Sequence, residues 1–157
     1  MINLLGEFDC KLDSKSRLTL PSGLKKQLGP EDSERFVINR GFEKNLSIYP
    51  EKEWARIVKE INSLNLYNKK NREFVRYFYR GATEIIADSA GRLLIPKSLH
   101  EYAGIDKDIA LIAYGQRIEI WAKDVYDVML SKEPEDFSTL AEEVMGKMNK
   151  GGNDELP

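Results

Sequence analysis

The chain repeats itself at an offset of 75 residues, between positions 6–29 and 81–104. Eight of 24 positions are identical, where chance matching at about a twentieth per residue type would give roughly one or two. The identical pairs are Gly6/Gly81, Asp13/Asp88, Ser14/Ser89, Arg17/Arg92, Leu18/Leu93, Pro21/Pro96, Leu24/Leu99 and Gly29/Gly104. A unit this small buries too little apolar surface to fold alone, so a second copy is expected to complete its core. We therefore expect the function to lie at a paired feature.

Composition predicts a soluble, globular chain. Its 157 residues, of which 41% are hydrophobic, suffice for one domain or two very small ones. No apolar run approaches the roughly 18 residues needed to span a membrane. Met1–Asp9 also lacks the basic start and long apolar run of a signal peptide. We therefore expect a cytoplasmic protein without a membrane partner.

Sequence patterns of catalytic and metal sites are missing. The lone Cys10 has no disulfide partner within the chain and, with the single His100, supplies too few ligands for a zinc site. No phosphate-binding loop or nucleophile elbow occurs. Asp13 and Asp88 resemble a carboxylate pair for hydrolysis, but each is tied to its own turn and arginine. We predict a protein that is not an enzyme, with no cofactor, no metal and no small-molecule substrate.

Charge is unevenly distributed along the chain. Residues 127–157 carry eight acidic and three basic residues, a net charge of -5, so residues 1–126 carry +3 of the total of -2. Two stretches of the body are basic: 11–26 and 65–80 each hold five basic residues and one acidic residue. Such clusters are either ordinary solvated faces or contacts for nucleic acid. The first cluster lies on the repeated motif.

Both halves predict the same order of short elements. A strand, a polar turn and a second strand that stops at a proline indicate a hairpin, and a short helix that ends near a glycine follows. Each half then has a second pair of strands around a glycine turn. The predicted strands are 6–12, 17–20, 36–39, 46–49, 83–87, 92–95, 109–113 and 118–121, and the predicted short helices are 24–28 and 97–103.

Helical periodicity appears outside the repeat. Residues 51–62 carry apolar side chains at helical spacing, at Trp54, Ile57, Val58 and Ile61. Residues 71–79 combine aromatic residues with interleaved arginines, which suits either base stacking or helix packing, and packing is favoured. Residues 124–130 open a third helix. Beyond Lys132 the chain is polar, so a short helix at most, followed by disorder, is expected.

The motif shared by both halves places an aspartate and an arginine four residues apart at a hairpin tip. The two copies are Asp13-Ser-Lys-Ser-Arg17 and Asp88-Ser-Ala-Gly-Arg92. An aspartate that begins a turn accepts hydrogen bonds from later backbone N–H groups, so it shapes the loop while the arginine is presented on the next strand. A guanidinium suits a guanine edge or a phosphate. The alternative is a local ion pair that staples the turn, and its occurrence twice at matched spacing favours surface recognition.

The doubled pattern Asp-x-x-x-Arg-Leu-x-[Leu/Ile]-Pro, joined through a helical segment, resembles the MraZ family of bacterial transcriptional regulators over residues 1 to about 145. The resemblance implies an α+β, mainly β fold. In it, two pseudo-twofold related swapped-hairpin (AbrB-like) units form an interleaved small barrel flanked by helices. It also implies ring-shaped homo-oligomers associated with the nucleoid. These would bind repeated double-stranded DNA elements in the promoter upstream of the division and cell-wall gene cluster, and so act on transcription.

The resemblance also assigns site residues by position. The DNA-facing residues fall on Asp13, Lys15 and Arg17 in the first half and on Asp88 and Arg92 in the second, and Lys11, in the same basic stretch, completes the predicted set. The second tip reads Ser-Ala-Gly where the first reads Ser-Lys-Ser, so the halves are expected to contribute unequal affinity for phosphate.

Four segments are expected along the chain. They are a first swapped-hairpin unit over 1–53, a helical connector over 54–80, a second unit over 81–126, and a helix with an acidic, disordered tail over 127–157. The main alternative function is an antitoxin-like or scaffold module whose tail binds another protein. If the hairpin tips read DNA, removal of residues 132–157 leaves DNA binding intact.

Overall fold

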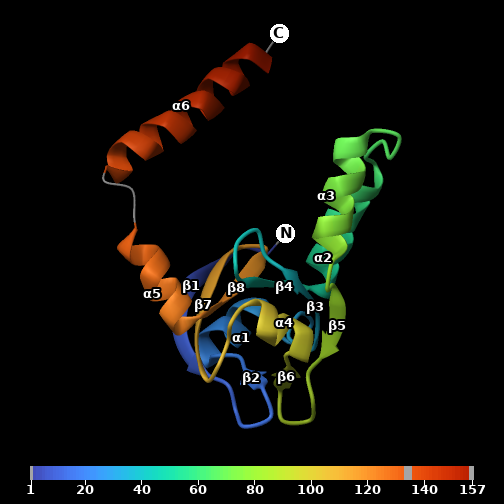
Figure 1. Ribbon diagram of the computed structural model, residues 1–157, viewed down its shortest axis with the longest axis vertical. Helices are drawn as coiled ribbons and strands as arrows, with labels where there is room; N and C mark the ends of the chain where they lie inside the picture. Colours follow the sequence, from blue (N-terminus) through green and yellow to red (C-terminus); the bar gives the residue numbers. More distant parts are fainter. Residues whose placement is uncertain (1, 133–135, 156–157) are drawn as a thin grey trace. The chain divides into compact units, whose positions relative to one another are not determined.

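The computed structural model describes residues 2–132 and 136–155 of the chain (Figure 1). The chain divides into two compact units, residues 1–126 and 127–157. The first unit holds both copies of the repeat.

Both halves of the repeat follow the predicted order of elements. The first half contains β1 (Leu4–Lys11), β2 (Arg17–Thr19), α1 (Ser22–Leu28), β3 (Arg35–Arg40) and β4 (Leu46–Pro50). The connecting helices are α2 (Glu51–Asn62) and α3 (Lys69–Tyr79). The second half contains β5 (Thr83–Ile86), β6 (Arg92–Leu94), α4 (Lys97–Tyr102), β7 (Asp108–Gly115) and β8 (Arg117–Ala122), and α5 (Lys123–Ser131) and α6 (Phe137–Glu155) follow. The predicted strands of the repeat and helices 24–28, 51–62, 71–79, 97–103 and 124–130 are confirmed.

Strands of the two halves interleave in one six-stranded antiparallel sheet, in the order β1-β7-β8-β4-β3-β5. The first strand of each half pairs with the third strand of the other half, as β1 with β7 and β5 with β3, while β4 and β8 pair at the centre. The predicted α+β class is confirmed. The expected interleaved small barrel is corrected, because the sheet does not close: β1 and β5 are its open edges, and β2 and β6 pair with each other in a separate two-stranded sheet.

The two-stranded sheet has a register that is symmetric between the halves. Leu18 pairs with Leu93, and these residues are equivalents at the 75-residue offset. Arg17 pairs with Leu94, and Thr19 pairs with Arg92. The two arginines therefore lie at opposite ends of a three-residue ladder. Because a strand rises about 3.3 Å per residue, this short ladder keeps the two hairpin tips close together.

One hydrophobic core joins the two halves. Leu18 of β2 and Leu93 of β6 are buried in it, and Leu24 of α1 and Leu99 of α4 are buried as well. The core continues along the sheet through Phe36, Ile38, Leu46, Ile48, Ile109, Leu111, Ile118 and Ile120. Apolar residues of both copies thus share one interior, as expected of a repeat too small to bury its own.

Aromatic rings hold α2 and α3 together. The ring of Phe78 stacks on Trp54 with 5.3 Å between centroids, and Tyr79 meets the same indole edge-on at 5.9 Å. Tyr49 of β4 lies 5.5 Å from Trp54 and ties the helix pair to the sheet. Helix packing is therefore the confirmed role of Phe78 and Tyr79. Figure 1 shows α2 and α3 rising from the sheet at the end opposite β2 and β6.

The second unit is helical. Helix α6 is longer than the short helix expected beyond Lys132. Its exposed apolar side chains recur at intervals of three and four residues, which favours a helix despite the polar composition, at Phe137, Leu140, Val144 and Met148. Residues 133–135 and 156–157 of the expected tail lie outside the described residues. Of the helices in residues 2–132 and 136–155, none is long and apolar enough to cross a membrane.

Candidate nucleic-acid interface

The first hairpin tip is a turn built around the carboxylate of Asp13. Its Oδ1 accepts hydrogen bonds from the backbone N–H groups of Lys15 and Arg17, at 2.9 and 3.0 Å. Its Oδ2 accepts a hydrogen bond from Nε of Arg17 at 2.7 Å. The backbone closes the turn through the N–H of Ser16, which donates to the carbonyl of Asp13 at 3.0 Å. The aspartate thus fixes both the loop and the direction of the guanidinium.

The second tip repeats this geometry bond for bond. Oδ1 of Asp88 accepts hydrogen bonds from the backbone N–H groups of Ala90 and Arg92, both at 2.9 Å. Oδ2 of Asp88 accepts a hydrogen bond from Nε of Arg92 at 2.8 Å, and the N–H of Gly91 donates to the carbonyl of Asp88 at 2.9 Å. The turn-shaping role predicted for both aspartates is confirmed. The local ion pair considered as the alternative is also present in both tips.

Each tip contains one residue in the left-handed backbone region. Ser16 has φ of 61°, and its equivalent Gly91 has φ of 77°. A side chain at such φ costs roughly 1–2 kcal/mol, which glycine avoids. The first tip therefore keeps a conformation that its sequence does not favour, and the bonds to Asp13 stabilise it.

Hydrogen bonding keeps the tip carboxylates ionised. For Asp13 the largest influence, desolvation, raises the pKa, but the hydrogen bonds from Arg17 and Lys15 outweigh it and lower the pKa below its ordinary value. For Asp88 the backbone hydrogen bond from Arg92 is the largest influence, and the pKa is again lowered. Both tips therefore carry a paired anion and cation at neutral pH.

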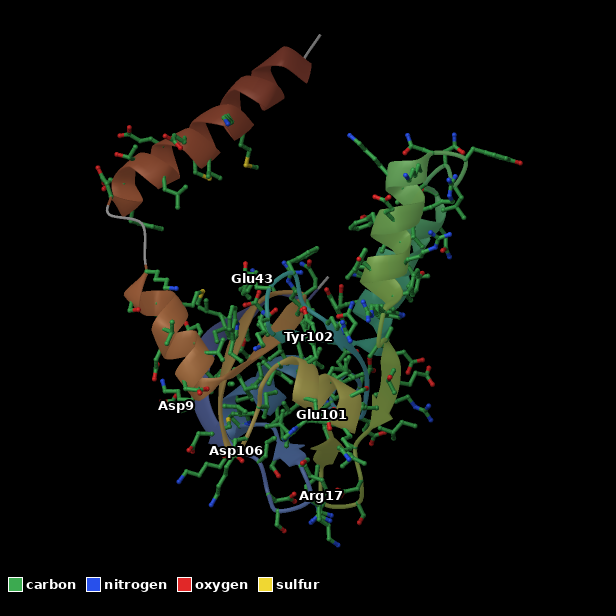
Figure 2. The ribbon with its side chains drawn as sticks, in the orientation of Figure 1. Asp9, Arg17, Glu43, Glu101, Tyr102 and Asp106 are labelled. Atoms are coloured by element: carbon green, nitrogen blue, oxygen red, sulfur yellow. The ribbon has the colours of Figure 1, made fainter. Side chains whose placement is uncertain are left out.

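The two tips lie side by side at one end of the first unit. Nη1 of Arg17 is 3.9 Å from Oδ2 of Asp88, so the guanidinium of one tip reaches the carboxylate of the other. Figure 2 shows Arg17 where the β1–β2 and β5–β6 loops meet. Within the described residues, the side-chain hydrogen bonds of Arg17 and Arg92 use Nε alone. The terminal nitrogens of each guanidinium remain as donors for another partner.

The predicted lysines take different places at the first tip. Lys15 is exposed within the turn itself, two residues after Asp13. Lys11 is the exposed last residue of β1 and stands opposite Asp108 of β7 in the sheet register. The structure thus gathers Asp13, Lys15, Arg17, Asp88 and Arg92 in the two tips and places Lys11 in the strand before them.

Lys25 of α1 was not predicted as a site residue but lies at the second tip. Its Nζ is 2.9 Å from the position that a Cβ would occupy on Gly91. Lys25 also lines a polar cavity of about 470 Å³ together with Ser33, Glu34 and the second tip. Its membership of the basic stretch 11–26 was the available sequence signal. The pairing of β2 with β6 is what brings it to the other half of the repeat.

An aromatic groove lies at the end of the first unit from which α2 and α3 rise. Two adjoining cavities of about 520 and 360 Å³ form this groove, and the residues that line both are Phe42, Tyr49, Phe74 and Phe78. The guanidinium of Arg117 lies 5.4 Å from the ring centre of Phe42. The hydroxyl of Tyr102 donates to the carbonyl of Glu43 at 3.2 Å along its rim, and Figure 2 labels both residues. The sequence did not predict this groove, because its walls come from separate strands, turns and helices.

Comparison with known proteins identifies the family. The family model described as "MraZ protein, putative antitoxin-like" matches residues 4–77 and again 78–147. The chain belongs to the MraZ family. Relatives named transcriptional regulator MraZ include one from Christiangramia forsetii, 48% identical over 93% of this chain and 95% of the relative. Those from Flavobacterium psychrophilum and Cytophaga hutchinsonii are 46% and 39% identical, over 95% and 92% of this chain and 96% of each relative.

Each of the two matches to the MraZ model contains one hairpin tip. Asp13 and Arg17 fall in the first match, and Asp88 and Arg92 fall in the second. The boundary between the matches lies inside α3, just before β5 begins the second copy. The family resemblance inferred from the doubled motif is therefore confirmed.

Proposed function

We propose that this protein is a sequence-specific regulator of transcription that binds double-stranded DNA through its two hairpin tips. The observation that carries the proposal is the identical set of Asp–Arg bonds in two tips that lie side by side. A turn staple alone requires neither adjacency nor repetition. The relatives named transcriptional regulators support the same function.

The proposed recognition group is the guanidinium of Arg17 and of Arg92. Nε of each arginine is bonded to its aspartate, so the side chain loses little further freedom when its terminal nitrogens bind. Two parallel N–H groups match the O6 and N7 acceptors of guanine, or two oxygens of a phosphate. Asp13 and Asp88 position the arginines, and Lys15 and Lys11 add charge for the DNA backbone.

The proposed target is a promoter with repeated elements, upstream of the division and cell-wall gene cluster. Because the tips of one chain are close together, one chain covers a short stretch of DNA. We infer that several copies assemble, as a ring, and that each tip pair meets one element. Once the first pair is bound, the remaining contacts are intramolecular and gain from effective concentration. We also infer that each half is a swapped-hairpin (AbrB-like) unit and that the assembly associates with the nucleoid.

The aromatic groove is the surface that we propose for contact between copies. Phe42 is 73% exposed and Tyr77 is 69% exposed beside it. Large rings exposed around a concave apolar surface are typical of protein interfaces. The groove lies at the end of the first unit opposite the tips, so a partner copy seated there leaves the tips accessible.

Binding to the upstream DNA tests the proposal. The proteins compared are wild type, Arg17→Ala, Arg92→Ala and the double variant, on the upstream duplex and on a scrambled duplex over a salt series. Loss of a bidentate arginine contact costs about 1–3 kcal/mol, so each single variant should bind the upstream duplex roughly 5- to 150-fold more weakly. The preference over scrambled DNA should disappear in the double variant.

Arg76→Ala is the matched control, because it removes the same charge from an exposed site on α3. It should bind as wild type does. Equal binding by wild type and the double variant, with assembly unchanged, would make the motif a structural staple and favour the scaffold or antitoxin-like alternative.

A further inference from the structure

The two tips share their Asp–Arg geometry but differ in their lysines. Lys15 occupies the third position of the first tip, and the equivalent position of the second tip is Ala90. The two backbones are held alike, since the N–H groups of both residues donate to the aspartate Oδ1 at 2.9 Å. If only the residues of its own loop are counted, the second tip carries one positive charge fewer than the first.

Lys25 supplies the missing ammonium from the other half of the repeat. Its Nζ lies against Gly91, 2.9 Å from the place of a Cβ there, so the charge stands beside the turn that holds Arg92. The side chain is half-buried and follows Leu24, which is anchored in the core. The partial burial of Lys25 itself reduces the rotamer freedom that a fully exposed lysine would lose on binding.

The neighbours of Lys25 leave its charge available. Asp88 and Glu34 line the same cavity. Asp88 is already bonded to Arg92 at 2.8 Å, and within the described residues Lys25 forms no ion pair at 4.0 Å or less with either carboxylate. The cavity of about 470 Å³ beside it is lined mainly by polar residues.

At the offset of 75 residues, neither lysine has a lysine as its counterpart. The counterpart of Lys15 in the second half is Ala90, and the counterpart of Lys25 is His100, a half-buried residue of α4. The first tip therefore has its lysine within the loop, whereas the second tip has its lysine on a helix of the opposite half. The glycine at position 91 leaves room for it, where a Cβ would crowd the ammonium.

We propose that Lys25 is a DNA phosphate contact of the second tip and performs there the role that Lys15 performs at the first. This inference rests on the proposed function. An ammonium binds phosphate as a point charge and does not discriminate between bases. On this inference the two halves contribute similar phosphate affinity, contrary to the expectation drawn from the loop sequences.

Salt dependence measures the number of phosphates that the protein neutralises. The slope of log K against log salt changes by about 0.9 per phosphate contact. Each contact therefore adds about eightfold more to the affinity at 0.1 M salt than at 1 M salt. Lys25→Ala should reduce the slope by about one per tip pair bound and weaken binding to upstream and scrambled duplexes alike. Lys15→Ala should have an effect of the same size.

Two further variants separate a phosphate contact from a structural role. Lys26→Ala removes the same charge from the next, exposed position of α1 and should leave the slope unchanged. Lys25→Ala/Ala90→Lys returns a lysine to the second tip at the position equivalent to Lys15 and should restore the slope. A wild-type slope for Lys25→Ala, or no restoration by the double variant, overturns the inference.

The arginine variants keep this outcome distinct from failure of the proposed function. If Arg17→Ala/Arg92→Ala loses upstream preference while Lys25→Ala keeps the wild-type slope, the tips read DNA and Lys25 is not a phosphate contact. If the arginine variant binds as wild type does, the proposed function fails, whatever the slope of Lys25→Ala. Equal midpoint temperatures of thermal unfolding for wild type, Lys25→Ala and Lys26→Ala would show that both variants are folded.

Discussion

At the residue scale, two carboxylates determine the shape of both tips. Asp13 and Asp88 each accept three hydrogen bonds, two from backbone N–H groups and one from a guanidinium. These bonds form with the ionised carboxylate and lower its pKa. Because the folded pKa lies below the unfolded value of about 3.9, each carboxylate stabilises the fold above that value. The stabilisation is lost as the pH falls through the folded pKa.

The difference in free energy of unfolding between wild type and Asp13→Asn/Asp88→Asn is expected to depend on pH in the acid range. The free energy of unfolding, measured by chemical denaturation, should favour wild type at pH 6, and this advantage should shrink as the pH falls below about 3.9. Asp136→Asn is the comparison outside the tips: hydrogen bonds from Thr139 also lower the pKa of Asp136, but this residue lies in the second unit. Its variant should leave the free energy of unfolding of the first unit unchanged at both pH 6 and pH 2. An advantage of wild type that stays constant between pH 6 and pH 2 would contradict the assigned role of the tip carboxylates.

At the element scale, an aromatic cluster packs α3 against α2. No residue of α3 is buried, and two of its rings pack on Trp54 of α2, those of Phe78 and Tyr79. Trp54→Ala should therefore destabilise the helix pair by about 2–3 kcal/mol, below the 3–5 typical of a fully buried ring. Amide hydrogen exchange should rise in α3 and remain unchanged in β2 and β6.

Tyr67→Ala is the control for the aromatic cluster. Tyr67 lies in the loop between α2 and α3 and is 96% exposed, so its removal should change stability by less than about 0.5 kcal/mol. Slow exchange of α3 in Trp54→Ala would mean that contacts other than the cluster hold the helix.

The elements themselves were largely predictable from the sequence, because their signals are local. Pro21, Pro96 and the alternating residues before them mark the hairpins, and the spacing of Trp54 and Ile61 marks α2. The partner of each strand was not predictable in this way. Leu18 pairs with Leu93 across 75 residues. No local pattern in the sequence distinguishes this pairing from the strand pairing of a closed barrel. The place of Lys25 at the second tip follows from the same long-range pairing.

At the scale of the whole molecule, the proposed tips and the proposed self-association surface lie at opposite ends of the first unit. Phe42→Ser/Tyr77→Ser removes two exposed rings that line the aromatic groove and leaves the buried core intact. The variant should form smaller assemblies in light scattering than wild type does. It should bind a duplex with one element as wild type does and lose the 10²- to 10⁴-fold gain on a duplex with several elements.

Deletion of residues 132–157 is the comparison that separates the role of the tips from the role of the groove. The deleted segment is acidic and contains neither the tips nor the groove, so the shortened chain should keep the assembly size and the affinity for a single element. Loss of single-element binding on deletion would move recognition out of the hairpins. An unchanged assembly in Phe42→Ser/Tyr77→Ser would exclude the groove as the contact between copies. We expect the groove variant to lose only the gain on several elements and the deletion to lose nothing. In that case the tips provide the affinity for one element, and assembly through the groove provides the gain.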